Sequence, residues 1–393
     1  MQLGTKSRLS LLFLFFLAVY FVSSLPVVFK DTFHHYVYLA DALSRGRLNL
    51  RLPVRGEHDY RDSFDDIAVY DNRFYLALPP APALVLVPFL GLGGVHLNAR
   101  LATVFIGAVG AGLCWLLLKK EEPDERSRLR LTLLFGLGTV YWFVAAHGGS
   151  WYMAQVCAVT FLLGSLLAAQ RGRGLAGGLL LAGAFLCRQL TLLALPAVLA
   201  TLGESPRGRN TRQRLLAVLG TTAGIFLYLL YNHLRFGNPL ETGYAHHLIR
   251  GEAVIQFQRY GLFHSHYLVR NLYTLLLMPP KFLGRFPFIY PRPEGMALIF
   301  TSPALFYALS APFRDRGTAA LGLSVFLILG AQLFYCNNGA WQFGYRFILD
   351  ALPLLIILTS RGMRRARAGP AGFLIAYSVA ANLYGVVLLR NLL

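Results

Sequence analysis

The chain has 393 residues, of which 56% are hydrophobic and 14% are charged. Soluble domains average about 45–50% apolar and about 25% charged residues, so this composition excludes a water-soluble globular enzyme. The net charge of +19 comes from 37 Lys and Arg against 18 Asp and Glu. In a polytopic membrane protein, basic residues flank the spans and fix their orientation, so no nucleic-acid partner is expected.

Apolar runs account for most of the sequence. The first run, 9–29, follows Lys6 and Arg8 and exceeds the usual apolar core of a signal peptide, which indicates an uncleaved first span. The further runs lie at about 97–118, 131–146, 152–169, 174–187, 189–203, 215–234, 296–313, 318–336, 347–360 and 370–389. They predict an all-α, polytopic protein with about eleven transmembrane helices in a single domain, 1–393.

The run 79–94 begins Pro-Pro-Ala-Pro and either spans the membrane or lies at its surface. We favour the surface position, because the short inner segments are then rich in Lys and Arg. These inner segments are 1–8, 119–130, 171–173, 204–214, 314–316 and 361–367. The two long external loops are then 30–96 and 235–295, and all ten histidines lie on or near the outer face. An active site is therefore expected to face outward.

Asp31 directly follows the first span, in the sequence Lys-Asp-Thr-Phe-His-His. A carboxylate at headgroup depth can accept a proton from an attacking hydroxyl or amine, although a solvated loop acid is the alternative. After it, the apolar residues of 36–45 are spaced as in a short amphipathic helix that lies on the membrane surface and ends at Gly46.

Several arginines stand in or near apolar segments. Arg188 is alone among apolar residues and needs an anionic partner, which is either a structural acid or a ligand phosphate. Arg346 and Asp350 are four residues apart, so an ion pair on one helix face is the structural alternative to ligand binding there. No histidine spacing matches a metal motif such as HExxH, so no metal ligands are assigned.

In this order along the chain, the motifs resemble those of the GT-C superfamily of membrane glycosyltransferases, which use polyprenyl-phosphate-linked sugars. The resemblance is greatest to the group that includes the lipid A aminoarabinose transferase and the protein O-mannosyltransferases. It rests on the interval from Asp31 to Gly46 and on the segments 72–82, 232–239 and 344–350. The sequence departs from the family pattern at Thr32, Leu78 and His147, where Glu, Lys and a second acid are common.

The resemblance implies a GT-C fold, with amphipathic juxtamembrane helices in the first external loop. It implies inverting transfer of a sugar from a polyprenyl-phosphate donor to a lipid, glycan or protein acceptor. Asp31 is then the catalytic base, and His147 takes the place of the second acid. The residues expected to bind the donor phosphate or the substrate are Arg73, Tyr75, Arg188, His34, His35, Arg235 and Arg346. Aromatic residues of the second long loop, such as Tyr244, Tyr260 and Tyr267, are candidates for stacking on sugar rings.

The implied location is a bacterial-type inner (plasma) membrane, with the active site on its periplasmic or extracellular face. The implied partners are the donor, the acceptor and membrane lipids. No cofactor is assigned, and a divalent cation stays an open alternative. Two other functions fit a multi-pass chain: a lipid-linked sugar transporter or flippase, and a non-catalytic lipid-binding subunit. A transporter tends to show related halves and polar sites at mid-membrane, whereas here the polar residues gather at one face.

Overall fold

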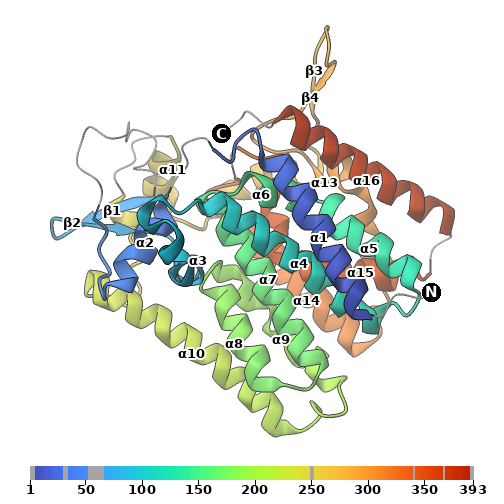
Figure 1. The fold of residues 1–393 in the computed structure, drawn as a ribbon, viewed down its shortest axis with the longest axis horizontal. Coiled ribbons are helices and arrows are strands. Elements are labelled where there is room, and N and C mark those ends of the chain that lie inside the picture. Colours follow the sequence, from blue (N-terminus) through green and yellow to red (C-terminus); the bar gives the residue numbers. More distant parts are fainter. Residues whose placement is uncertain are drawn as a thin grey trace.

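The protein is a bundle of long helices with a small assembly of short helices and a two-stranded hairpin at one end (Figure 1). This computed structural model describes residues 5–29, 34–51, 66–247, 252–339, 341–365 and 368–389. Within these ranges, six helices are long and apolar enough to cross a membrane. They are α1 (Thr5–Ser24), α4 (Ala99–Glu121), α7 (Ser150–Gln170), α10 (Thr211–Phe236), α14 (Arg316–Leu333) and α16 (Ala368–Leu388). The chain is a multi-pass membrane protein.

The predicted count of eleven spans is not confirmed, because several apolar runs are broken. The helices α5 (Glu125–Leu137) and α6 (Tyr141–His147) meet at 53° and form a seventh span only if counted together. The helix α8 (Gly174–Phe185) has 12 residues and rises about 18 Å, against a hydrocarbon thickness of about 30 Å. Beyond it, the 3₁₀ helix η4 (Gln189–Ala194) leads into the short α9 (Leu195–Gly203).

Prolines divide two further runs. Pro303 begins the 3₁₀ helix η7 (Pro303–Ser310), which follows the single turn α13 (Leu298–Thr301). The run that starts at 347 is divided near Pro353, where the 3₁₀ helix η8 (Arg346–Ala351) passes into α15 (Leu352–Met363). Proline has no backbone N–H and suits the first turn of a helix, so each of these runs begins a new helix rather than continuing one.

The described elements of the segment predicted to be the first external loop lie together on the left of Figure 1. The predicted amphipathic helix is confirmed as α2 (His35–Ser44), which buries its apolar side. The strands β1 (Ile67–Tyr70) and β2 (Arg73–Leu76) form a hairpin whose turn residues Asp71 and Asn72 have positive φ, as a two-residue hairpin turn requires.

Residues 79–94 do not form a long helix. The helix α3 (Ala81–Leu86) and the 3₁₀ helix η2 (Val87–Leu92) together have 12 residues, too few to cross a bilayer. A surface position is therefore the better interpretation of this segment.

The second external loop also folds against this end of the bundle. Its elements are η5 (Tyr244–His246), α11 (Glu252–Tyr260), η6 (Ser265–Tyr267), α12 (Leu268–Leu276), β3 (Lys281–Phe282) and β4 (Ile289–Tyr290). An antiparallel bridge between Ala68 and His247 joins the loop to the β1–β2 hairpin. The β3–β4 hairpin projects away from the bundle (Figure 1).

Glycines allow close helix crossings in the core. Along α8 and α10, a Cβ added at Gly220 would lie 2.8 Å from the Leu179 backbone nitrogen, and one at Gly224 would collide with Ala182. The Gly220 and Gly224 pair therefore packs one helix against another, as its spacing predicts. The helix α7 is the most buried of the six long helices and lies between α4 and α8.

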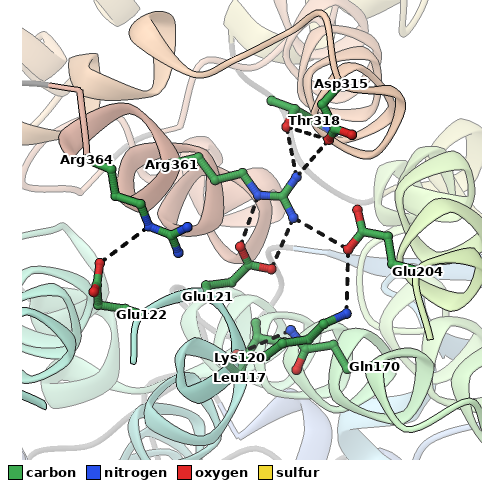
Figure 2. Close-up of polar contacts among 10 residues, drawn as sticks. All are labelled: Leu117, Lys120, Glu121, Glu122, Gln170, Glu204, Asp315, Thr318, Arg361 and Arg364. Carbon is green, nitrogen blue, oxygen red and sulfur yellow. Dashed lines mark hydrogen bonds and ion pairs between the residues drawn. The ribbon is translucent and has the colours of Figure 1, made fainter. Parts of the chain in front are cut away.

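A charged network joins the ends of four helices, α4, α9, α14 and α15 (Figure 2). Arg361 on α15 donates to both oxygens of the Glu121 carboxylate, at 3.0 and 3.1 Å, and to the Thr318 hydroxyl at 2.9 Å. It also pairs with Asp315 at 3.5 Å and with Glu204 at 3.7 Å. These residues come from four of the predicted inner segments or their borders, so the structure brings those segments to one side.

Arg361→Met removes the cation shared by three carboxylates and is expected to destabilise the bundle by about 3–5 kcal/mol, as for a broken buried ion pair. The measurement is chemical or thermal unfolding of the purified protein in detergent. Arg364→Gln is the matched control, because Arg364 is half exposed and contacts Glu122 at 3.6 Å. Equal stability of the Arg361→Met variant and wild type would contradict a structural role for the network.

Candidate functional site

A cavity of about 220 Å³, which we call the polar cavity after the charged side chains in its otherwise largely apolar wall, opens at the end of the bundle that carries α2. Its wall combines residues from distant parts of the chain: Tyr36 from α2, Trp151 from the first turn of α7, Tyr228 from α10 and Tyr335 just after α14. The break between α8 and η4 contributes Arg188, and η8 contributes Asp350. Breaks between helices at this end of the bundle thus place polar residues around a shared space.

Arg188 and Asp350 form the main ion pair of the cavity. The Arg188 Nε lies 3.1 and 3.2 Å from the two carboxylate oxygens of Asp350, and its Nη2 lies 2.9 Å from Oδ2. Gln332 donates to the same oxygen at 2.9 Å. Asp350 is 1% exposed, whereas the Arg188 side chain is 25% exposed. The carboxylate therefore anchors the pair, and part of the guanidinium remains accessible from the cavity.

The structural alternative of an ion pair between Arg346 and Asp350 is not the arrangement found, because Asp350 pairs with Arg188. Arg346 and Asp350 lie on a 3₁₀ helix, which has three residues per turn, so positions four apart do not share a face as they do on an α-helix. Arg346 instead donates to Gln155 at 3.1 Å. The Phe347 ring lies 5.0 Å from the Arg188 guanidinium and 5.1 Å from that of Arg346, so one aromatic ring contacts both cations.

Asp66 brings a second carboxylate to the edge of the cavity. It precedes β1 with a φ of +65°, and its carboxylate accepts a hydrogen bond from the indole of Trp151, a cavity residue. Burial raises the pKa of Asp66, while His247, Trp151 and Arg346 act in the opposite direction. Burial also lowers the pKa of His247, against the attraction of Asp66. Asp66 and His247 therefore attract each other in a partly desolvated setting.

An apolar groove of about 600 Å³ lies next to the cavity. Ala154 on α7 lines the cavity, and Cys157, one turn further along the same helix, lines the groove. On the opposite wall, Pro79 lines the cavity and Val85 of the following helix lines the groove. A polar cavity and an apolar groove that share two walls suit an amphipathic ligand with a polar head and a long chain.

No family model and no curated protein matches this sequence. Among solved structures, the chain is similar to ArnT from Cupriavidus metallidurans bound to undecaprenyl phosphate, with 19% identity and a TM-score of 0.53. The match covers 93% of this chain and 61% of that one. The fold is of the GT-C type. The apo state of the same ArnT gives 18% identity and a TM-score of 0.51, over 94% of this chain and 62% of that one.

The predicted GT-C fold is therefore confirmed, and the chain spans about three fifths of the ArnT length. At this low identity, the likeness establishes the fold and leaves the activity to be argued from the site.

Of the predicted binding residues, Arg188 is the one that lines the cavity. Arg73 is exposed at the tip of the β1–β2 hairpin, and Tyr75 is buried against Phe236, with ring centroids 5.4 Å apart. Arg235 is buried and donates to the Leu76 carbonyl at 2.6 Å. Arg235 and Tyr75 thus join the hairpin to the end of α10, a position that explains their burial without a ligand.

The predicted histidines occupy different environments. His34 is half-buried before α2, and His35 is buried with its Nδ1 at 3.0 Å from the Ser150 hydroxyl. His147 is fully buried, and its Nδ1 lies 2.9 Å from the Phe143 carbonyl oxygen. Its ring stacks on that of Phe143. His147 is outside the cavity lining, and its catalytic role stays a prediction. The predicted base, Asp31, lies outside the described residues.

The sequence did not single out most of the cavity. The local sequence gave no sign of Asp66 and suggested Arg346 as the partner of Asp350, whereas their actual partners, Trp151 and Arg188, lie 85 and 162 residues away. Gln332 is a polar residue inside an apolar helix, which was the one available signal. Of the tyrosines suggested for stacking, Tyr244 lines the cavity, whereas Tyr267 is buried and donates to the Gly261 carbonyl.

A double-mutant cycle tests the Arg188 and Asp350 pair. Arg188→Gln and Asp350→Asn are each expected to destabilise the protein by about 3–5 kcal/mol, because each leaves an unpaired charge in a largely buried site. The double variant is expected to lose much less than the sum, since both charges are then removed together. The measurement is chemical unfolding in detergent, and additive losses would show that the two groups do not interact.

Asp66→Asn is expected to change how stability depends on pH. With its pKa raised, the folded wild type keeps the Asp66 proton to higher pH than the unfolded chain does. Its stability therefore falls as the pH rises from about 4 through the raised pKa, and the asparagine variant escapes this loss. Unfolding temperatures from pH 4 to 8 measure the difference. Asp71→Asn at the exposed hairpin turn is the control, and parallel curves for Asp66→Asn and wild type would contradict the effect.

Proposed function

We propose that the protein is an integral-membrane glycosyltransferase that moves a sugar from a polyprenyl-phosphate donor to a lipid, glycan or protein acceptor on the outer face of the membrane. The observation that carries the proposal is a GT-C fold over most of the chain, with a polar cavity beside an apolar groove. The similar ArnT structure contains undecaprenyl phosphate, which is a ligand with a phosphate head and a long apolar chain.

The walls of the site suit the two parts of such a donor. The groove offers apolar side chains of α3, η2, α4 and α7 to the polyprenyl chain. The cavity offers the accessible part of the Arg188 guanidinium to the phosphate, and the phenol of Tyr244 and the indole of Trp151 to the sugar. Arg188 is already held in place by Asp350, so its orientation costs little entropy when a phosphate arrives.

The proposed reaction is an inverting displacement at the anomeric carbon. The acceptor hydroxyl or amine loses its proton to the Asp31 carboxylate and forms a bond to the anomeric carbon. The bond from that carbon to the phosphate oxygen breaks on the opposite face, and the polyprenyl phosphate leaves with the electron pair. Arg188 stabilises the negative charge that develops on the leaving phosphate.

Asp31 is assigned the role of base from its place in the sequence. It precedes the cavity residue Tyr36 by five residues, a chain length of at most about 18 Å. His35 is the first residue of α2, and Ser150 is the first residue of α7. The hydrogen bond between their side chains fixes the start of α2 against α7.

The test is turnover by purified full-length protein in nanodiscs with a panel of polyprenyl-phosphate sugars. Wild type is expected to release polyprenyl phosphate, and Asp31→Asn is expected to lose at least about 10²-fold in rate, as for the loss of a general base. Asp71→Asn is the matched control, because it removes one exposed carboxylate from the same external loop. Full activity of Asp31→Asn would contradict its assignment as the base.

The same assay separates the alternatives. Donor binding without turnover, across all donors and acceptors offered, would contradict catalysis and favour a lipid-binding subunit. Movement of a fluorescent lipid-linked sugar between leaflets of a vesicle, without cleavage, would favour a flippase.

A further inference from the structure

A second apolar depression lies at the other end of α7, away from the polar cavity. This crevice has a volume of about 390 Å³ and lies between α4, α7 and α8. Leu113, Gly164, Ala168 and Leu180 are among its apolar lining residues. Thr160 and Phe161 line both the crevice and the apolar groove, so the two depressions meet halfway along α7.

Two arginines lie at the end of the crevice that is farthest from the apolar groove. Arg171 and Arg173 both line it, and both are exposed in the tight turn between α7 and α8. The turn is closed by backbone hydrogen bonds from Arg171 and Arg173 to the Ala168 carbonyl, at 3.1 and 3.0 Å. Gly172 at its tip has a φ of +73°. The two guanidinium groups are thus carried on a rigid turn.

The surroundings of this turn are strongly basic. A Cβ added at Gly172 would lie 2.6 Å from the Cβ of Arg207, so the following loop brings a third arginine to the same place. Between residues 171 and 214, Glu204 is the one acid, against six arginines once Arg188 of the polar cavity is left out. Its carboxylate is already paired with Lys120 at 3.6 Å and with Arg361 at 3.7 Å. The arginines at the crevice are therefore available to bind an anionic ligand.

The dimensions of the crevice match one leaflet of a bilayer. From Thr160 to Arg171 the helix rises about 16 Å, and half of a hydrocarbon core is about 15 Å. The arginines then lie at the depth of lipid headgroups, and the apolar lining lies at the depth of acyl chains. Basic pockets between transmembrane helices bind anionic headgroups in this arrangement.

We propose that this crevice binds an anionic phospholipid, with one acyl chain between α4 and α8 and its phosphate headgroup on Arg171 and Arg173. The ligand belongs to the leaflet opposite the polar cavity, because α7 carries the two sites at its opposite ends. A zwitterionic lipid offers the same acyl chain but adds a cation beside the arginines, so it binds more weakly.

The test is native mass spectrometry of the full chain in detergent, with phosphatidylglycerol and phosphatidylcholine of identical acyl chains. Wild type is expected to retain phosphatidylglycerol in preference to phosphatidylcholine. The R171Q/R173Q variant is expected to bind phosphatidylglycerol at least about tenfold more weakly than wild type does. R126Q/R130Q is the matched control, because it removes two exposed arginines from α5, away from the crevice, and is expected to bind as wild type does.

Gly164→Leu tests the apolar part of the site without changing charge. A Cβ at Gly164 approaches Leu180 no closer than 3.5 Å, so a leucine there fills the crevice without moving the backbone. It is expected to weaken binding of both lipids. The proposal is overturned if wild type binds both lipids equally, if R126Q/R130Q loses as much as R171Q/R173Q, or if Gly164→Leu leaves phosphatidylglycerol binding unchanged.

Discussion

The ion pair between Arg188 and Asp350 is the interaction on which the polar end of the bundle depends. Each residue lies where a helix is interrupted, Arg188 between α8 and η4 and Asp350 in η8. Interrupted helices expose backbone polar groups and leave room for side chains, and inside a membrane both need partners. A bidentate pair meets this need for two interruptions at once, and the space left beside it becomes a cavity lined by polar residues.

The two ends of the bundle use charge in different ways. At the end away from α2, Arg361 joins Glu121, Asp315 and Glu204 in a network that connects four helices and leaves little charge unpaired. At the cavity end, Arg188 is paired but accessible, and Asp66 is held partly desolvated beside Trp151 and His247. Networks of the first kind stabilise a fold, whereas strained or desolvated groups of the second kind are common at functional sites.

The sequence predicted those features that depend on local pattern. Apolar periodicity gave α2, the composition indicated a polytopic helical protein, and the order of weak motifs indicated the GT-C fold. The sequence was a poorer guide to the contacts between residues that are far apart in the chain. Arg346 and Asp350 have the spacing of an α-helical ion pair. In the structure, however, η8 is a 3₁₀ helix, and Asp350 forms its ion pair with Arg188. The predicted eleven spans are not confirmed, because apolar length alone does not reveal where Pro303 and Pro353 begin a new helix.

A single helix, α7, contributes to the polar cavity, the apolar groove and the crevice described above. Ala154 lines the polar cavity, Cys157 the apolar groove and Gly164 the crevice near Arg171. Rotation of this helix about its axis therefore changes the shape of every site together, and ligands that prefer one orientation are thermodynamically linked. Such linkage is reciprocal: a lipid that tightens binding of a second ligand by some factor is itself held more tightly by the same factor. Under the two proposals above, the lipid composition of one leaflet then bears on ligand binding in the cavity at the other end of α7.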